Sequence, residues 1–433
     1  MRPSDLQGAD FARSDDPLLD RLLRAAGEQH IKGVDLSLDR ISRLLARMGS
    51  PHLKLPPVFH VAGTNGKGST CAFLRAALEA GGHRVHVFTS PHLVRVNERI
   101  RLAGTLVTNE EFAEALADVL RINAGQPLSF FEALTAAAFL LFAATPADAA
   151  VLEVGLGGRL DSTNVVPEPL VTGIAELAMD HAAILGPTIL HIAAEKAGIA
   201  KRGVPLVTQR YPAAVARRVA EVAALKGARL MPRGEAWDAA RYEGRLHVRK
   251  LADGEPALSL PPPRLPGPHQ EDNAALAIAM LLHQDQFALR ESDFRQAMQW
   301  VNWPARLQRL ATGPLVDRLP PGSELFLDGG HNPSAGKAIA EFAGGLPRPL
   351  VIVLGMLATK DHAGFLKALP ADARRIGLPV PGHASIDPAA LAPETAADVA
   401  EALGLVREPA RVLVCGSLHL AGEVLRLNGP LPA

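Results

Sequence analysis

The stretch that decides the fold is His60-Val61-Ala62-Gly63-Thr64-Asn65-Gly66-Lys67-Gly68-Ser69-Thr70. An apolar run (58–61) leads into it and an apolar helical pattern (72–78) follows, which predicts a strand, a glycine-rich turn and a helix. Backbone N–H groups of such a turn and of the helix start point to a common centre and favour an anion there. The sequence therefore predicts a phosphate-binding loop within an α/β fold.

The residue types of this loop suit a nucleotide. Lys67 can reach the outer phosphates, and the hydroxyl of Ser69 or Thr70 can hold Mg²⁺. A turn rich in glycine for steric reasons alone would explain neither the lysine nor the hydroxyls. Gly68 stands where a common phosphate loop has Ser or Thr directly after the lysine, so an ordinary kinase or motor is not indicated. The predicted nucleotide-binding set of the loop is Gly63, Thr64, Asn65, Gly66, Lys67, Gly68, Ser69 and Thr70.

Length and composition limit the class of protein. A chain of 433 residues is too long for a single core and predicts at least two domains, and 48% hydrophobic residues suit a globular protein. Lys+Arg and Asp+Glu both total 45, so net charge favours neither a nucleic acid nor a membrane partner. The N-terminus lacks the apolar stretch of a secretory signal, and the two cysteines suit a reducing compartment. We therefore expect a cytoplasmic protein.

Apolar strand patterns and helical patterns alternate along most of the chain. Strands are predicted at 58–61, 84–88, 149–154, 170–174 and 206–208, and helices at 69–80, 110–121, 132–143 and 189–199. This alternation predicts a mainly parallel sheet covered by helices, with ligands beyond the carboxyl ends of the strands. Residues 234–268 are predicted to form hairpins, followed by helices at 272–282 and 291–298.

A second α/β alternation is predicted in the last third of the chain. Its strands are expected at 325–327, 350–354, 375–378 and 411–414, and its helices at 334–342, 363–369, 396–403 and 417–427. The Trp303-Pro304 dipeptide lies just before it, and we place the domain boundary there, giving domains 1–303 and 304–433. The second domain is expected to be a smaller parallel-sheet domain.

Polar residues at predicted strand ends are the candidates for chemistry. Glu153 ends a strand beside the loop and can hold Mg²⁺, although a carboxylate there can also cap local amides. Asp161 can close the glycine-rich turn that follows. His181 follows another strand, where a lone histidine is more often a surface residue than a ligand. Lys196, near a helix end, would by itself be interpreted as a solvated residue.

Three more candidates have an ordinary alternative. Asn273 lies where it could merely cap a helix. Arg306 could clamp a phosphate or form a surface ion pair. Asp328 precedes a tight turn and could simply cap the end of its strand.

The motifs form an ordered set that no single one of them could establish. In chain order they are HVAGTNGKGST (60–70), TSPHL (89–93), NERIR (97–101), EVGLGGRLDSTN (153–164), DH (180–181), EKAGI (195–199), HQEDNA (269–274), WPARL (303–307), DGGHNP (328–333) and GSLHLAGEV (416–424). This series, from about residue 35 to 427, closely resembles the folylpolyglutamate synthase family, which includes bifunctional dihydrofolate synthases, within the Mur ligase superfamily. Gly68 after the lysine is a feature of that family.

The resemblance implies a fold and an activity. The fold would be a P-loop-containing, Mur-ligase-like ATP-binding domain with a mainly parallel sheet, followed by a smaller Rossmann-like α/β domain. The activity would be ATP-dependent amide formation between a pteroate or folate carboxylate and L-glutamate through an acyl phosphate. The implied partners are dihydropteroate, tetrahydrofolate, L-glutamate and ATP, and the implied state is a monomer. Alternatives are a monofunctional folylpolyglutamate synthase, a Mur-type peptidoglycan-precursor ligase, and a nucleotide-binding regulator without ligase activity.

The resemblance also assigns roles to residues of this chain. The implied metal ligands, for two Mg²⁺ sites, are Ser69, Glu153 and His181. Lys196 would carry a carbamate, which reverses its interpretation as a solvated residue. The residues implied in nucleotide binding outside the loop are Asn273, Arg306 and Asp328, and those implied in catalysis are Lys67, His181, Lys196, Asp328 and His331. The pterin substrate would lie near Ser90, Pro91, His92, Arg159 and Asp161.

Overall fold

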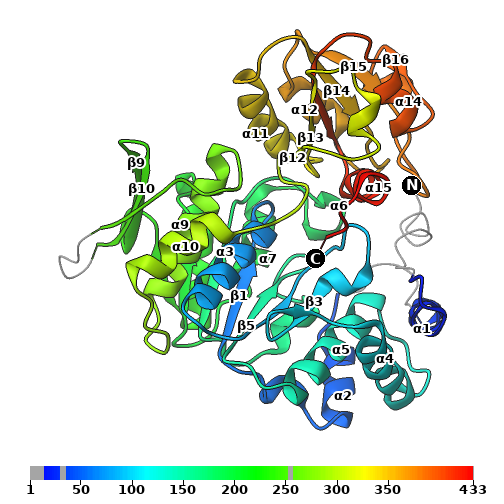
Figure 1. Cartoon of the computed structure of the whole chain (residues 1–433). Coiled ribbons are helices and arrows are strands. Elements are labelled where there is room, and N and C mark those ends of the chain that lie inside the picture. The colour runs from blue at the N-terminus through cyan, green and yellow to red at the C-terminus, as the bar shows by residue number, and fades with distance from the viewer. Residues whose placement is uncertain (1–13, 30–35, 252–256, 433) are drawn as a thin grey trace. The chain divides into compact units, whose positions relative to one another are not determined.

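The computed structural model describes residues 14–29, 36–251 and 257–432. The first 13 residues, on which the expected lack of a secretory signal rests, lie outside this part of the chain. The chain divides into two compact units: unit 1 comprises Met1–Arg264 and Glu271–Val301, and unit 2 comprises Leu265–Gln270 and Asn302–Ala433 (Figure 1). Unit 2 thus begins its main segment close to the expected boundary and also takes in Leu265–Gln270, which the expected boundary assigns to the first domain.

Unit 1 is built on one large sheet. Within the described residues its strand order is β4-β3-β2-β5-β1-β6-β7-β8. Five strands, β2, β5, β1, β6 and β7, are buried along their whole length, as expected where helices cover both faces of a parallel sheet. The strands are β1 (Val58–Ala62), β2 (Val85–Phe88), β3 (Ile100–Leu102), β4 (Thr105–Leu106), β5 (Ala149–Glu153), β6 (Val171–Ile174), β7 (Pro205–Thr208) and β8 (Arg229–Pro232).

The mainly parallel sheet predicted from the sequence is confirmed. Strands β2, β5, β1, β6, β7 and β8 pair in parallel, whereas β3 and β4 add to one edge in antiparallel fashion. The antiparallel edge was not predicted, because β3 and β4 have only three and two residues and carry little periodic signal. Strand β8 and helix α8 (Ala213–Lys226) were also missed.

Helices surround this sheet. They are α1 (Pro17–Glu28), α2 (Asp39–Arg47), α3 (Lys67–Ala80), α4 (Asn109–Asn123), α5 (Phe130–Ala144), α6 (Ala182–Leu185), α7 (Ile189–Ala197), α8, α9 (Pro268–Leu282) and α10 (Glu291–Trp300), with short 3₁₀ turns at Pro51–Leu53, Val96–Arg99 and Ser162–Val165. Among the described residues, no helix is both long and apolar enough to cross a membrane.

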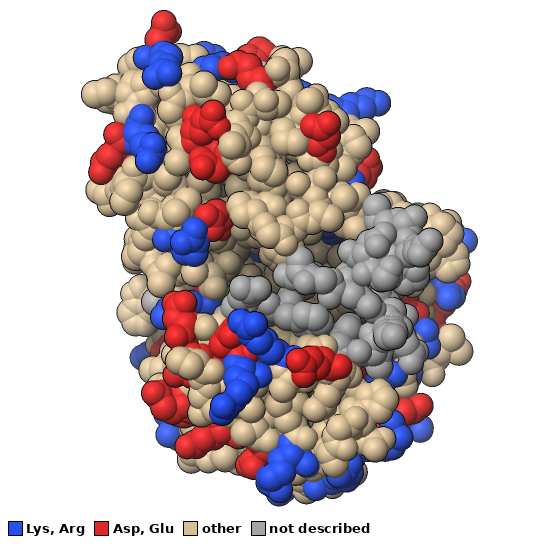
Figure 2. All heavy atoms as spheres, turned by 90° about the vertical axis from the view of Figure 1, so that its right-hand side faces the viewer, with Lys and Arg blue, Asp and Glu red and all other residues tan. Residues whose placement is uncertain are grey.

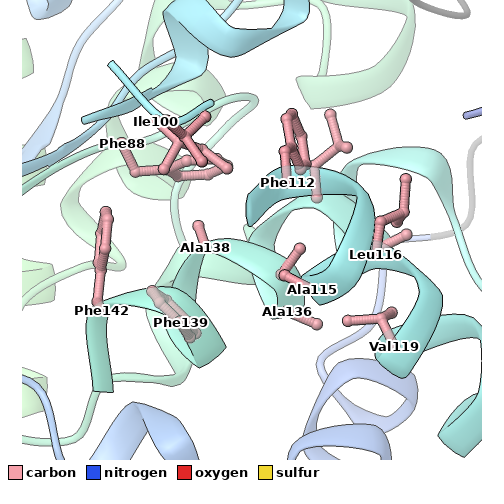
Figure 3. Packing of buried hydrophobic residues seen from close by; sticks show 14 of the residues in the cluster. Phe88, Ile100, Phe112, Ala115, Leu116, Val119, Ala136, Ala138, Phe139 and Phe142 are labelled. Atoms are coloured by element: carbon pink, nitrogen blue, oxygen red, sulfur yellow. The ribbon is translucent and has the colours of Figure 1, made fainter. Parts of the chain in front are cut away.

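Local signals and packing explain why α4 and α5 form. Thr108 and Ser129 each begin a helix with a capping box, in which the side chain three residues on, Glu111 or Glu132, bonds back to the cap. The aromatic and aliphatic side chains of both helices then pack into one core beneath β2 and β3, as Figure 3 shows for Phe88, Ile100, Phe112, Leu116 and Phe139.

A separate antiparallel sheet follows β8, as the hairpin pattern predicted. It contains β9 (Trp237–Tyr242), β10 (Arg245–Lys250) and β11 (Leu258–Leu260) in the order β11-β10-β9. Trp237 is fully buried, whereas the far end of β9 is exposed. One end of this small sheet is therefore packed into unit 1.

Unit 2 is the smaller α/β domain that the second alternation predicted. The order of its strands, among the described residues, is β12-β13-β17-β14-β15-β16, and all neighbours pair in parallel except β12. The strands are β12 (Gln308–Leu310), β13 (Glu324–Leu327), β14 (Leu350–Leu354), β15 (Arg374–Gly377), β16 (Glu394–Thr395) and β17 (Arg411–Cys415). The helices are α11 (Pro333–Gly344), α12 (His362–Ala368), α13 (Pro388–Leu391), α14 (Val399–Gly404) and α15 (Leu418–Asn428), with a 3₁₀ turn at Val316–Arg318.

Charge on the surface is mixed. On the face shown in Figure 2, acidic and basic side chains are interspersed rather than segregated. Several charged side chains of the protein pair with a neighbour on the same helix, such as Arg24 with Asp20 and Arg426 with Glu423. Exposed pairs of this kind add little stability, at most about 1 kcal/mol each.

Candidate active site

The predicted phosphate loop lies between β1 and α3. Gly66 has a φ of +81° and leads directly into α3 at Lys67, so the helix start faces the loop. The Thr64 N–H donates to the Glu176 carbonyl at 2.7 Å, and the Asn65 amide donates to the Glu176 carboxylate at 2.9 Å. The Lys67 ammonium donates to the Thr64 carbonyl at 3.2 Å. The residues after β6 thus hold the loop in a fixed shape.

Two hydroxyls in the first turn of α3 are ready for a ligand. Ser69 and Thr70 are buried, and neither Oγ of Ser69 nor Oγ1 of Thr70 has a hydrogen-bond partner in the part of the chain that the structure describes. An unsatisfied buried hydroxyl costs about 1–3 kcal/mol, and a bound metal ion or phosphate would remove that cost. This is the arrangement expected at a nucleotide site.

Asn273 packs directly against the phosphate loop. A Cβ on Gly66 would lie 3.3 Å from Asn273 Nδ2 and closer still to its Oδ1, so the loop backbone and this amide leave no room for a side chain. Asn273 is buried and lies well inside α9. It therefore does not cap the helix, and the simple capping role considered from the sequence is wrong.

Glu153, the last residue of β5, lies beside the same turn of α3. Its carboxylate accepts the Ser90 N–H at 3.1 Å. The pKa of the buried Cys71 thiol is raised first by burial and then by the charge of Glu153, and the charge of Lys67 opposes this rise. These couplings place Glu153 and Lys67 each in the neighbourhood of Cys71. The phosphate loop, Glu153 and Ser90 are thus brought together from three strand ends.

Asp161 holds the glycine-rich turn after β5 in place. Its carboxylate accepts the N–H groups of Gly155 at 3.0 Å, Leu156 at 2.9 Å and Thr163 at 3.0 Å. The Thr163 hydroxyl donates to the same carboxylate and lies 2.8 Å from Nε2 of His60. Burial raises the pKa of Asp161, while these hydrogen bonds act in the opposite direction. The turn-closing role considered from the sequence is present in the structure.

Lys196 is buried, so its interpretation as a solvated residue is wrong. Only 5% of the residue is exposed, near the end of α7. Burial, and then the nearby positive charge of Lys67, lower its pKa to about 7, while the carboxylates of Asp180, Asp161 and Glu195 act in the opposite direction. A substantial fraction of this amine is therefore neutral at physiological pH.

The loop after β5 rests on the helix that carries Lys196. The Arg159 N–H donates to the Glu195 carbonyl at 2.8 Å, and a Cβ on Gly158 would lie 3.0 Å from the Lys196 Cα. The Arg159 guanidinium donates to the Glu195 carboxylate at 2.9 Å but remains half exposed. Glycine at position 158 is thus required for the approach of these two segments, and Arg159 remains accessible to a ligand.

The remaining candidates of unit 1 occupy different settings. His181 has a left-handed backbone (φ +52°) and an exposed ring 3.9 Å from the Asp180 carboxylate. His92 accepts a hydrogen bond from Arg99 at 2.9 Å, next to Pro91. Across the described residues, no three His, Cys, Asp or Glu side chains lie together as a ready metal site. The metal roles of Glu153 and His181 therefore stay predictions.

Sequence reasoning assigned no role to several residues that support the site. Glu176 fixes the phosphate loop, and His60 and Thr163 support Asp161. Asp180 faces Lys196 from the loop before α6. Glu176, His60 and Asp180 act on segments far away in sequence, so local patterns carry no signal for their roles. Thr163 bonds Asp161 two residues away, and its bond to His60 joins that turn to β1.

Within unit 2, three candidates gather at the carboxyl end of β13. Asp328 is buried, and its carboxylate accepts the N–H groups of Leu307 at 2.8 Å and Gly330 at 2.7 Å. Arg306 stands between Ala305 and Leu307, which have φ values of +54° and +48°. Backbone strain of this kind is enriched at functional sites, and here it flanks Arg306 on both sides.

His331 lies on the same turn as Asp328. Its Nδ1 is 3.0 Å from the Gly329 carbonyl, which indicates an N–H at Nδ1 and leaves Nε2 as the acceptor of the ring. The Arg306 guanidinium donates to the Ala305 carbonyl at 2.8 Å. Asp328 therefore holds both the turn that carries His331 and the segment that carries Arg306 in place.

Comparison with known proteins gives a consistent result. No family model matches the chain. It is 35% identical over 412 residues to the dihydrofolate synthase/folylpolyglutamate synthase of Escherichia coli, covering 92% of each chain. A solved structure of the bifunctional folylpolyglutamate synthase/dihydrofolate synthase of Yersinia pestis with AMPPNP and Mn superposes with a TM-score of 0.83 at 33% identity, covering 96% of this chain and 98% of that one.

A further solved structure of a bifunctional folylpolyglutamate synthase/dihydrofolate synthase contains Mn, AMPPNP and L-glutamate. It matches with a TM-score of 0.83 at 32% identity, covering 96% of this chain and 99% of the other. Similarity at this level extends over both units and over 92% to 99% of these relatives' own length. The chain therefore belongs to the dihydrofolate synthase/folylpolyglutamate synthase family.

Proposed function

We propose that this protein joins the carboxylate of dihydropteroate, or of a reduced folate such as tetrahydrofolate, to the amine of L-glutamate at the expense of ATP. The observation that carries the proposal is the phosphate loop, with its buried unpartnered hydroxyls, beside Glu153 in a member of this family. In the first step a carboxylate oxygen attacks the γ-phosphorus and ADP leaves. In the second the glutamate amine attacks the acyl carbon, loses a proton and expels phosphate.

Residues of the phosphate loop suit the first step. Negative charge builds on the phosphoryl oxygens during the transfer, and fixed cationic and N–H groups lower its energy. Lys67 supplies the cation, and the N–H groups at the start of α3 supply the dipoles. The bonds from Thr64 and Asn65 to Glu176 keep these groups in place before ATP binds.

The donor set fits a divalent metal ion. A hard cation takes oxygen ligands, and the hydroxyl of Ser69 or Thr70 and the carboxylate of Glu153 offer them beside the loop. Glu153, His181 and a carbamate on Lys196 would supply a second site. When bound, Mg²⁺ would neutralise charge on the phosphates of ATP and orient the γ-phosphoryl group.

Lys196 is suited to carry a carbamate. Carbon dioxide adds to a neutral amine, losing a proton and converting a potential cation into a carboxylate. The lowered pKa of Lys196 supplies the neutral amine, and Lys67 would favour the anionic product. The buried amine would thus become an oxygen donor near the phosphate loop.

We assign the pterin substrate to the loop after β5 and to residues 90–92. Arg159 is half exposed and can meet an anionic or carbonyl group, while Asp161 keeps the loop in shape. Ser90 lies next to Glu153, and this would bring the carboxylate of a substrate bound there near the phosphoryl group. In unit 2 we assign a phosphate contact to Arg306 and roles in nucleotide binding and catalysis to Asp328 and His331.

A direct assay tests the proposal. Purified protein is given ATP, Mg²⁺, L-glutamate and either dihydropteroate or tetrahydrofolate, and ADP and the pterin product are measured. We expect ADP release that requires both the pterin acid and glutamate, with a product heavier by one glutamate residue, and no turnover by Lys67→Met. ADP release without glutamate incorporation would refute the ligase proposal.

The same assay separates the alternatives. Product from tetrahydrofolate but not from dihydropteroate would indicate a monofunctional folylpolyglutamate synthase. Turnover of a nucleotide-linked peptidoglycan precursor would indicate a Mur-type ligase, and nucleotide binding without any turnover a regulator. The monomeric state and the cytoplasmic location stay predictions, of which sedimentation of the purified protein tests the first.

A further inference from the structure

The small antiparallel sheet of unit 1 has no motif and no role in the chemistry described above. One end of it lies against the region where α9 carries Asn273. The fully buried Trp237 begins β9, and its indole N–H donates to the Met231 carbonyl at 3.2 Å. Four residues earlier, directly after the end of β8, stands Arg233.

The guanidinium group of Arg233 joins its own segment to three others. Its Nη1 donates to the Asp272 carboxylate at 2.6 Å and to the side-chain oxygen of Gln209 at 3.1 Å. Its Nη2 donates to the Ala239 carbonyl at 2.8 Å, and its Nε to the Asp238 carboxylate at 3.3 Å. The group also lies over the Trp237 ring, with Cζ 5.6 Å from the ring centroid. With 17% of its side chain exposed, Arg233 is held from several sides.

These bonds act on the residues next to Asn273. Asp272 is held twice, since its carboxylate accepts from Arg233 and its backbone carbonyl accepts from the Gln209 amide at 2.6 Å. The preceding residue, Glu271, pairs with Arg241 of β9 at 3.2 Å. Residues 271 and 272 are thus tied to β7, β8 and β9, and the next residue is the Asn273 whose amide packs on Gly66.

We propose that Arg233 is a positioning residue for nucleotide binding. It fixes Asp272, and through the helix backbone it holds Asn273 in register against the phosphate loop. The proposal rests on the proposed function in so far as Asn273 contacts the nucleotide. A rigid guanidinium fork fixes direction as well as distance, which a lysine would not do. The small sheet then has a role, because Asp238 and Ala239 of β9 accept hydrogen bonds that orient the guanidinium group of Arg233.

The test compares ADP binding and kinetics in matched variants of the full-length chain. Arg233→Met removes the guanidinium donors, and Asp272→Ala removes the carboxylate that accepts from them on α9. Because the Asp272 side chain is 57% exposed, Asp272→Ala is expected to fold even if Arg233→Met does not. Arg210→Met is the control, because Arg210 pairs with Asp238 at the surface and, within the described part of the chain, makes no hydrogen bond or ion pair to α9. ADP affinity is measured by calorimetry, and KM values are measured for ATP and for the pterin acid.

We expect Arg233→Met and Asp272→Ala each to weaken ADP binding and raise KM for ATP about fivefold to twentyfold, with KM for the pterin acid within twofold. Arg210→Met should stay within twofold throughout. In an Asn273→Ala background, Arg233→Met should cause little further loss, since its effect passes through that amide.

Three results would overturn the proposal: unchanged ADP affinity in a folded Asp272→Ala variant, an equal rise in KM for both substrates, or additive losses in the double variant. The proposed function fails separately. It would fail if the unaltered protein bound ADP but made no amide, a result that leaves the Arg233 variants still measurable by calorimetry.

Discussion

Activity should depend on dissolved carbon dioxide, because Lys196 can accept it only as a neutral amine. Burial lowers the pKa of Lys196 from 10.5 to about 7. At pH 7.5 roughly three quarters of such amines are neutral, against roughly 0.1% for an ordinary lysine, so the reactive form is enriched about 10³-fold. Because the neutral amine is the deprotonated form, its fraction falls as pH falls, from about 90% at pH 8 to about 10% at pH 6. Carbamate formation should therefore be lost as pH falls through 7.

The assay removes carbon dioxide and restores it. Protein is degassed and dialysed at pH 6, and initial ligase rates are then measured at pH 7.5 with and without added bicarbonate. Without bicarbonate we expect the ligase rate of the unaltered protein to fall at least about tenfold. The rate of Lys196→Ala should be about 10³-fold or more below that of the unaltered protein with bicarbonate, a loss comparable to removal of a catalytic group. Acetate should partly restore Lys196→Ala, because it supplies a carboxylate at the emptied position.

Lys201 provides the matched control. Burial lowers its pKa as well, to about 8, but its ammonium donates to the Asn164 carbonyl at 2.8 Å. Lys201→Ala should keep the same dependence on bicarbonate as the unaltered protein. Rates that ignore bicarbonate after complete removal of carbon dioxide, or a Lys196→Ala variant with ordinary turnover, would refute the carbamate reasoning and leave the family assignment intact.

Three further variants test the site. Gly66→Ala should weaken ADP binding at least about tenfold, because the added Cβ would clash with Asn273. Gly82 has a similar φ (+85°) but no neighbour within 4 Å of an added Cβ, so Gly82→Ala should cost only about 1–2 kcal/mol of stability and leave ADP binding unchanged. Equal ADP affinities of the two variants would contradict this reasoning. Thr163→Val removes the hydroxyl that bonds both His60 and Asp161, so it should lower stability by about 1–3 kcal/mol and raise KM for the pterin acid. Thr163→Ser should restore both. Thermal melts and kinetics measure these effects, and a Thr163→Val variant with unchanged stability and KM would contradict the role of these bonds. Asp328→Asn replaces an acceptor of the Leu307 and Gly330 N–H groups by a partial donor, and should lower the melting temperature together with turnover; full activity in a folded variant would remove Asp328 from the catalytic set.

Much of the fold follows from local patterns in the sequence. The strand from 350 to 354 was predicted with its observed ends, and the helix after the phosphate loop to within two residues, since continuous apolar runs and capping residues act over a few positions. The short strands β3 and β4 escaped prediction because two or three residues show no period, and they form only when β2 offers an edge.

The candidate site divides in the same way. Glycines, a lysine and hydroxyls between a strand and a helix identify a phosphate loop wherever they occur, because the geometry that they need is local. The settings of Lys196 and Arg233 could not be predicted, because groups near them, such as Lys67 and Asp272, come from other helices.

By itself, then, the sequence determined an α/β protein with a phosphate loop and, through its ordered motifs, the family to which it belongs. Tertiary structure alone decided that Lys196 is buried near Lys67 and Asp180, and that Asn273 packs against Gly66 instead of capping a helix. The physical reason is that hydrogen-bonded local structure depends on neighbours along the chain, whereas burial, charge coupling and close packing depend on neighbours in space.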